Sequence, residues 1–248
     1  MRKLILFICF ITVFASCNTT KRYYFYSKMD GAADVQKNEK GSLVIDRDSI
    51  DLVYSFFGEN ISMEVSVNNK TPFPLYIDWD KSWLRVNDKP TRPYNSLVSY
   101  VDYASVTEQM PHTQNTYNLL TSARFDFKQI SRKNLQKQKL YISDKKINTK
   151  TMQFEEDASP LVLTSCILVN INGKDIPFEN KFYLSSLTNG NKKAYHAFMN
   201  DMANRDDGFC INYSVDKKEA KIANGIFGGL LHLADFIITS KLEELGEE

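Results

Sequence analysis

The chain has 248 residues, of which 43% are hydrophobic and 12% aromatic, enough for a substantial core in one or two domains. Two of the 31 basic residues, Arg2 and Lys3, lie in an N-terminal segment that we expect to be cleaved as an export signal. The remaining 29 basic residues stand against 30 acidic ones, so the overall charge predicts no attraction to nucleic acid or anionic lipid. Many Phe and Tyr residues favour strands over a helical bundle.

The first 17 residues, MRKLILFICFITVFASC, have the pattern of an export signal. Two basic residues precede the apolar run 4–14, which is too short for a bilayer span of about 20 residues. The segment FASC resembles the lipobox of bacterial lipoproteins, although Phe14 stands where Leu, Val or Ile is usual. This resemblance implies that Cys17 is lipidated and that a lipid anchors the chain to a membrane. An ordinary secretory signal is the alternative.

The residues after Cys17 predict where the anchored chain resides. Asn18 in place of Asp implies, by the same resemblance, the outer membrane of the cell envelope. Residues 19–27 contain no acid, which favours a domain that faces the periplasm over one on the cell surface. Residues 18–40 are polar and mixed, and we expect a flexible tether.

Alternating hydrophobicity dominates residues 41–215, which we predict to be one β-domain or two sheets in tandem. Runs 50–56 and 61–67 flank a Gly-Glu-Asn turn, and runs 161–171 and 176–184 flank Asn172-Gly173, so each pair predicts a hairpin. Further strands are expected at 75–79, 83–86, 97–101, 124–127, 135–142 and 209–215. The Pro-rich stretch 88–122 otherwise indicates long loops.

Two late segments have a helical period. Apolar residues recur at i, i+3, i+4 and i+7 within 191–204, and a longer apolar stripe runs through 216–248. The C-terminal stripe predicts an amphipathic helix that docks on its own domain or on a partner. With many short strands before them, these helices indicate a mainly β antiparallel sandwich with late α-helices.

Residues 60–87, NISMEVSVNNKTPFPLYIDWDKSWLRVN, resemble a family of uncharacterised bacterial envelope lipoproteins. The specific part is the motif NKTPFPLYIDWDKS at 69–82. The resemblance implies an Ig-like β-sandwich, and it carries no catalytic residue over to this chain.

The same motif contains a candidate binding surface. Tyr76, Trp79 and Trp83 would form an aromatic platform beside Asp78. The alternative is that Trp79 fills the core and that Asp78 belongs to a turn or an ion pair.

Cys166 and Cys210 are the cysteines left once Cys9 and Cys17 are accounted for. In an oxidising envelope they would form a disulfide if their strands were neighbours. Two separate half-buried thiols are the other interpretation.

Motifs for catalysis are absent from the sequence. The three His residues have no zinc-ligand spacing, and no GxSxG, P-loop or GxGxxG occurs. Acid pairs such as Asp206-Asp207 have calcium-binding chemistry, but loops of neutral proteins often contain them. We therefore expect no metal, no cofactor and a non-enzymatic binding or structural module whose partner is an envelope protein or glycan. The alternative is an envelope hydrolase whose site assembles from distant residues.

Overall fold

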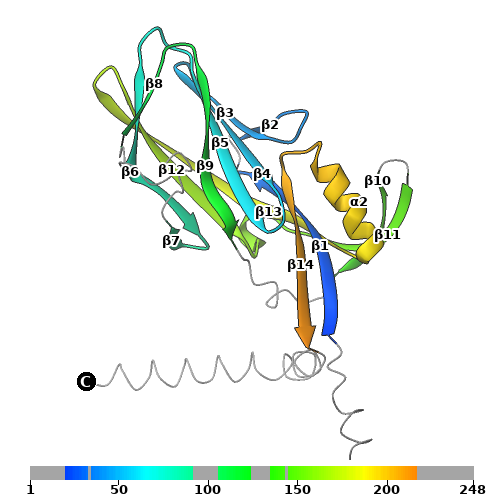
Figure 1. Ribbon diagram of the computed structural model, residues 1–248. Helices are drawn as coiled ribbons and strands as arrows, with labels where there is room; N and C mark the ends of the chain where they lie inside the picture. Colours follow the sequence, from blue (N-terminus) through cyan, green and yellow to red (C-terminus); the bar gives the residue numbers. More distant parts are fainter. Residues whose placement is uncertain (1–19, 33–34, 92–105, 124–134, 143–144, 217–248) are drawn as a thin grey trace, which may run out of the picture. The chain divides into compact units, whose positions relative to one another are not determined.

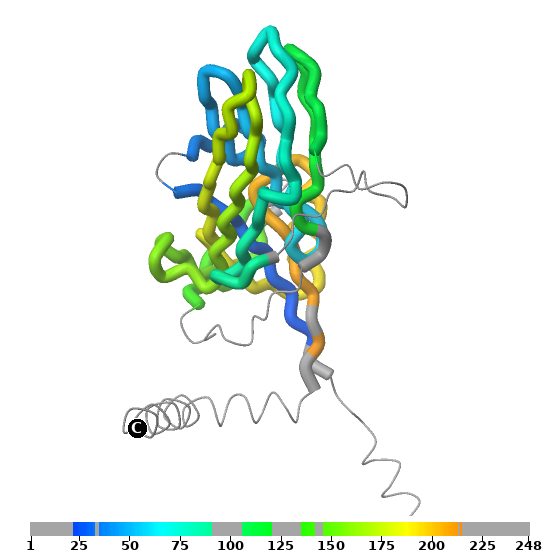
Figure 2. The backbone as a smooth tube through the Cα atoms, turned by 90° about the vertical axis from the view of Figure 1, so that its left-hand side faces the viewer, coloured from blue at the N-terminus to red at the C-terminus, as the bar shows by residue number. Residues whose placement is uncertain are grey.

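The computed structural model describes residues 20–32, 35–91, 106–123, 135–142 and 145–216 (Figures 1 and 2). Residues 24–212 form one compact unit. Residues 20–23 and 213–216 belong to a second unit and are the outer ends of strands β1 (Thr20–Gly31) and β14 (Gly208–Asp216). The predicted signal, the strands expected at 97–101 and 124–127, and the C-terminal helix beyond residue 216 lie outside the described residues.

Antiparallel sheets make up most of the described chain, so the protein is mainly β. The larger sheet has nine strands, and its main path runs in the order β10 (Gln136–Ile142), β11 (Lys145–Gln153), β13 (Lys174–Gly190), β12 (Val162–Ile171), β6 (Leu75–Val86) and β7 (Lys89–Thr91). Off this path, β1 pairs with β13, β14 pairs with β1, and β8 (Val106–Gln109) pairs with β6. A 3₁₀ turn, Glu156–Ala158, separates β11 from β12.

Strand β13 organises this sheet because both of its edges are used. Phe182 pairs with Leu163 of β12 on one edge and with Gly31 of β1 on the other. Asn189 likewise has Lys150 of β11 on one edge and β1 on the other. Strands β11 and β12 therefore follow one another along the same edge of β13, opposite β1.

The smaller sheet has five strands in the order β2 (Gln36–Lys37), β3 (Leu43–Asp46), β4 (Ile50–Phe57), β5 (Ile61–Asn69) and β9 (Gln114–Ala123). Strands β4 and β5 form the hairpin that the alternation predicts, and Gly58 and Asn60 turn the chain with φ of 84° and 67°. The second predicted hairpin is β12–β13, whose strands run side by side in Figure 2. Its turn residues Asn172 and Gly173 have φ of 52° and 78°.

Inner-face side chains of the two sheets contact each other. The ring of Phe182 on β13 lies 4.6 Å from that of Tyr54 and 5.6 Å from that of Phe56, both on β4. The Tyr54 hydroxyl, fully buried, accepts a hydrogen bond from Asn180 Nδ2 at 3.1 Å and lies 3.4 Å from Ser165 Oγ. Burial raises the pKa of Tyr54 to about 12, so the phenol is a neutral part of the core.

Helix α2 (Lys192–Met202) lies over the end of the larger sheet that β1, β13 and β11 form (Figure 1). It falls within the range 191–204 that the helical period predicts, and Asn191 caps it by accepting from the Ala194 N–H. Its buried side chains pack against Tyr26 and Cys210, with the Tyr26 and Phe198 rings stacked at 5.1 Å.

Two predictions about local structure differ from the fold. Most of the expected tether is β1, in which buried Phe25, Ser27 and Met29 alternate with residues of the opposite face. Because Tyr24 and Tyr26 lie on the opposite face, where Tyr26 is buried under α2, both parities are apolar and the period of two is hidden. The expected loops of 88–122 include β8 and β9, and the first half of β9 is polar, with Gln, Asn and Thr residues that resemble loop sequence.

Candidate functional site

The predicted platform residues lie on β6, where they divide between two faces. Tyr76, Asp78 and Trp83 pair with Asn170, Leu168 and Cys166 of β12, which share the outer face. Trp79 instead packs towards the smaller sheet, with its ring 5.1 Å from Tyr117 and its Nε1 donating to Thr107 Oγ1 at 2.9 Å.

These residues divide between the two faces because the pairing of β6 with β12 is interrupted between Asp78 and Trp83. Ser82 Oγ donates to the Asp78 carbonyl at 2.6 Å and accepts the Leu168 N–H at 3.0 Å, which closes a loop within the strand. Asp78 accepts the Lys81 N–H and pairs with the Lys81 ammonium at 2.9 Å.

The outer-face members are partly engaged. Tyr76 is 38% exposed and its hydroxyl donates to Glu108, and Trp83 lies under the guanidinium of Arg85 at 4.5 Å. A joint binding role for these residues stays a prediction.

Both remaining cysteines are buried free thiols. Cys166 lies on β12 and Cys210 on β14, and strands β13 and β1 lie between them in the sheet. Neighbouring strands are about 4.8 Å apart, so this separation exceeds the ~7 Å that a disulfide spans between Cα atoms. Burial raises the pKa of both thiols, to about 12 for Cys210, which leaves them unreactive.

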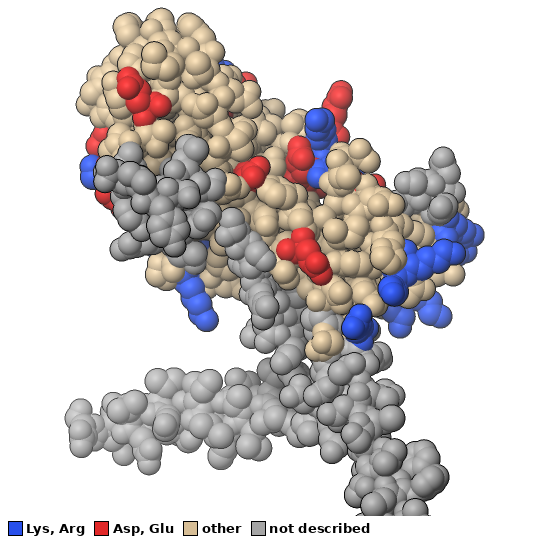
Figure 3. Space-filling model, in the orientation of Figure 1, with Lys and Arg blue, Asp and Glu red and all other residues tan. Residues whose placement is uncertain are grey.

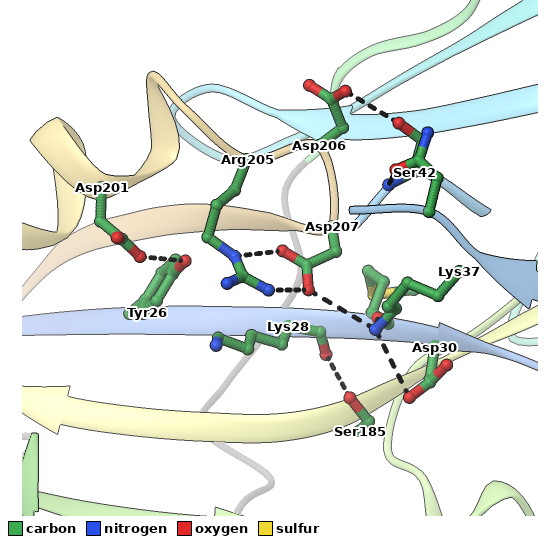
Figure 4. Close-up of polar contacts among 12 residues, drawn as sticks. Tyr26, Lys28, Asp30, Lys37, Ser42, Ser185, Asp201, Arg205, Asp206 and Asp207 are labelled. Atoms are coloured by element: carbon green, nitrogen blue, oxygen red, sulfur yellow. Dashed lines mark hydrogen bonds and ion pairs between the residues drawn. The ribbon is translucent and has the colours of Figure 1, made fainter. Parts of the chain in front are cut away.

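A buried ion-pair cluster surrounds Asp207, just before β14 (Figure 4). The Asp207 side chain is 1% exposed and accepts from Arg205 Nε at 2.9 Å and Arg205 Nη2 at 2.7 Å. Lys37 Nζ lies 3.5 Å from Asp207 and 3.5 Å from Asp30, and it donates to the Met29 carbonyl at 3.0 Å.

Backbone hydrogen bonds from the same segment extend the cluster into a junction. The Asp207 carbonyl accepts the Met29 N–H, and the Asp206 carbonyl accepts the Phe56 N–H at 2.7 Å. The Asp206 carboxylate accepts from Ser42 Oγ at 2.8 Å. Strands β1 and β4 and the residue that precedes β3 are thereby joined through one short segment.

Electrostatics identify the cluster as structural. Burial alone would raise the pKa of Asp207, but the hydrogen bond and charge of Arg205, with the charge of Lys37, hold it below its usual range. Nearby, burial and the charge and hydrogen bond of Asp201 raise the pKa of Tyr26. A carboxylate that is charged, buried and fully paired has no free lone pair aimed at a substrate. Among the described residues, no group of three or more His, Cys, Asp or Glu side chains is placed to hold a metal ion.

An open hollow of about 620 Å³ lies between the β3–β4 turn and the start of β13. Asp46 and Arg47 line one side, and Phe178 and Glu179 the other. Pro177 on the β13 side lacks an N–H, which weakens this edge as a place for strand addition. The hollow is open, and Asp46, Arg47 and Glu179 give its lining charges of both signs.

The most distinctive exposed surface is one face of the β10–β11 hairpin. Residues directly opposite one another share a face, and the pairs are Lys137 with Lys150, Lys139 with Asn148, and Tyr141 with Lys146. All six are exposed, and Tyr141, at 70%, is the most exposed large hydrophobic side chain of those described. We call these six residues the basic hairpin face.

The opposite face of the hairpin fixes it to the domain. Leu140 and Ile147 pack against the cluster of buried residues under α2. Thr149 and Thr151 on this face are buried, and Thr151 Oγ1 lies 2.9 Å from Thr188 Oγ1 of β13. The strands that carry the lysines are therefore held in place by packing of their opposite face on the domain.

Charge on the basic hairpin face is of one sign. No ion pair joins its four lysines to another described residue, and Lys137 and Lys150 stand directly opposite each other, which is unfavourable. Asp144, in the connecting turn, lies outside the described residues. In Figure 3 the basic side chains gather at the end of the domain that carries β10 and β11.

A hollow of about 560 Å³ adjoins this surface between β11 and α2. Lys146 and Asn148 line it from β11, and Lys193, His196 and Asn200 line it from α2. The hydrogen-bond donors of these side chains suit a ligand with anionic groups, such as phosphate or carboxylate.

Sequence reasoning missed this surface because net charge averages over the whole chain. The signal was present locally: residues 136–142 and 145–153 contain five lysines and no acid. Strand pairing was needed to place four of these lysines on one face.

No protein-family model, curated protein or solved structure matches this chain. Within the described ranges, no helix is both long and apolar enough to cross a bilayer.

Proposed function

We propose that this chain is a lipid-anchored protein of the cell envelope that acts as a non-enzymatic binding module for an anionic partner. Cys17 is the anchor, and the domain faces the periplasm from the outer membrane. The observation that carries the proposal is the basic hairpin face, whose four lysines form no ion pair with another described residue and lie around an exposed tyrosine.

The way the hairpin is packed on the domain favours a binding role over a catalytic one. A packed hairpin holds the backbone of its lysines at fixed positions on one face. Their ammonium groups are hydrogen-bond donors, and phosphate and carboxylate groups complement their charge. Asp207, the buried acid of the described residues, is paired with Arg205 and Lys37 and therefore serves the fold.

The fold that we propose is an Ig-like β-sandwich of the envelope-lipoprotein family that residues 69–82 resemble. Contacts of Tyr54 with Phe182 and of Trp79 with Tyr117 support two sheets packed face to face. The domain would then serve as a rigid carrier for the hairpin.

Labelled palmitate tests the anchor. Cells that express the wild type should yield a labelled protein, and cells that express Cys17→Ser should not. Equal labelling of the two proteins would refute lipidation at Cys17.

A photo-crosslinking residue tests the binding face. With p-benzoylphenylalanine in place of Tyr141, irradiation of intact cells should give an adduct that disappears when Lys137, Lys139 and Lys146 are all replaced by Gln. Phe73, an exposed aromatic residue outside the face, is the matched control position. Equal adducts at both positions, or an adduct insensitive to the lysines, would contradict the proposal.

A further inference from the structure

We propose that the basic hairpin face rests on the anionic phospholipid surface of the membrane to which the chain is anchored, so that the domain lies against the bilayer. This inference rests on the proposed anchor at Cys17. It names phospholipid headgroups as the partner of the hairpin.

Chain length keeps the domain close to the anchor. Tyr24, where the compact unit begins, is only seven positions after Cys17. At about 3.5 Å per residue they span at most about 25 Å, whatever path they take. The start of the unit therefore stays within about 25 Å of the anchored cysteine.

Strand register places the basic hairpin face at this same end of the unit. Asn189 pairs with Phe25 on one edge of β13 and with Lys150 on the other. Two strand spacings, about 10 Å, thus separate Phe25, next to the start of the compact unit, from Lys150 of the basic hairpin face. The lysines are within reach of the membrane that holds Cys17.

The chemistry of this face suits a surface of many phosphates. Lys137, Lys139, Lys146 and Lys150 project from an exposed, open face, which offers point charges over an area. Tyr141 among them has the apolar ring and polar tip of residues enriched at membrane interfaces. The hollow beside this face takes in Lys146 alone of the four lysines, whereas a membrane surface would contact them together.

The far end of the unit provides an internal control. Strand β13 has 17 residues and so extends about 55 Å, from the Asn172-Gly173 turn to the hairpin end. Phe73 precedes β6 at the turn end and is 51% exposed. Both ends therefore carry an exposed aromatic ring, and the feature that distinguishes the hairpin end is the group of four lysines on the basic hairpin face.

Vesicle sedimentation tests the contact without the lipid anchor. The chain from residue 17 onward, with Cys17→Ser, keeps every described residue and is exported behind a general secretory signal. It should sediment with vesicles of phosphatidylglycerol mixed with phosphatidylcholine and remain in solution with phosphatidylcholine alone. Each lysine near an anionic surface contributes about fivefold to binding, so K137Q/K139Q/K146Q should weaken it about 100-fold.

The matched control replaces three exposed lysines elsewhere, K40Q/K89Q/K174Q, with the same change in net charge. It should alter binding less than about fivefold. Equal losses in the two triple variants would reduce the effect to net charge and overturn the proposal. Absence of binding to the anionic vesicles would overturn it as well.

An environment-sensitive fluorophore tests the lipidated protein. Cys166 and Cys210 are buried, so a label attaches selectively to Tyr141→Cys or Phe73→Cys in the native protein. In proteoliposomes that contain phosphatidylglycerol, the label at 141 should shift to the blue and the label at 73 should not. Identical spectra at the two positions would contradict docking through the hairpin.

The outcomes separate this inference from the proposed function. Palmitate labelling of Cys17 without vesicle binding would leave an anchored module with a non-lipid partner and refute the membrane contact. Vesicle binding without palmitate labelling would refute the anchor and keep the hairpin as a membrane-binding element.

Discussion

Asp207 is the residue that most clearly joins distant parts of the chain. Its carboxylate is paired with Arg205 two positions away and with Lys37 at a separation of 170 positions. A Cβ at Gly41, which has φ of 91°, would lie 2.7 Å from Asp207 Cγ, so the β2–β3 turn also packs on this side chain. The residue holds its neighbours in register through charge and close packing.

Asp207→Asn is expected to lower the free energy of unfolding by about 2 kcal/mol, because Arg205 then loses its charged acceptor. The value is below that of a fully buried pair, since the side chains of Arg205 and Lys37 are 35% and 31% exposed. Urea unfolding measures the loss. Asp157→Asn, at an exposed position, is the control and should stay within about 0.5 kcal/mol of wild type.

Acidification should remove the same contribution. The pKa of Asp207 is lowered in the fold, so its stabilisation is present above the unfolded pKa of about 3.9 and is lost as pH falls through the folded pKa. The stability difference between wild type and Asp207→Asn should therefore shrink below about pH 4. Urea unfolding of both proteins at neutral and acidic pH decides this, and a constant difference would exclude Asp207 as the titrating group.

The sequence identifies Asp206-Asp207 as acidic but cannot assign its partner. Arg205 is visible as a neighbour, whereas Lys37 belongs to a segment expected to be a tether. Its approach depends on β1 pairing with β13, a contact between residues more than 150 positions apart. The cluster is thus a product of tertiary structure that local patterns do not encode.

At the scale of elements, strands were predictable where one face is buried and the other solvated. In β4 and β5 buried and half-buried residues alternate throughout, and the Gly58–Asn60 turn marks the reversal. Strand β11 carries lysine, asparagine and threonine along most of its length, so its pairing with β13 could not be seen in the sequence. Pairing of a polar strand depends on neighbours that its own residues do not specify.

Gly190 sets how closely α2 approaches the sheet. A Cβ there would lie 2.5 Å from Ala194 Cβ and 3.0 Å from Phe198 Cε2. Gly190→Ala should therefore push α2 outward and lower the free energy of unfolding by about 1–2 kcal/mol, the overpacking cost reduced by the lower entropy of the unfolded chain. Urea unfolding gives the loss, and hydrogen exchange should accelerate in α2.

Asn200→Ala, on the exposed side of the same helix, is the matched substitution and should change stability by no more than about 0.5 kcal/mol. If Gly190→Ala left exchange in α2 unchanged, the close approach of the helix would not be a requirement of the fold.

At the scale of the whole molecule, a near-neutral chain conceals an uneven distribution of charge. The acids of Asp46 and Asp51 are balanced by Lys70, and Asp78 is balanced by Lys81. The lysines of the basic hairpin face have no such balance among the described residues. A lipid anchor and a basic surface at one end of a domain would act as two additive membrane signals, and stable attachment commonly requires two.

Export of the chain without its lipid should reveal the second signal in cells. With a general secretory signal and Cys17→Ser, we expect part of the protein to remain on membranes at low ionic strength and to be released at about 1 M salt, where the Debye length falls to about 3 Å. Adding K137Q/K139Q/K146Q should make the protein soluble at both ionic strengths, whereas adding K40Q/K89Q/K174Q should leave the salt-dependent fraction in place. Immunoblots of membrane and soluble fractions measure the distribution.

Two outcomes would contradict this expectation. If neither high salt nor replacement of the hairpin lysines reduced the membrane-bound fraction, another surface would hold the domain on the membrane. If the C17S protein were fully soluble at low salt, the lipid alone would attach the chain.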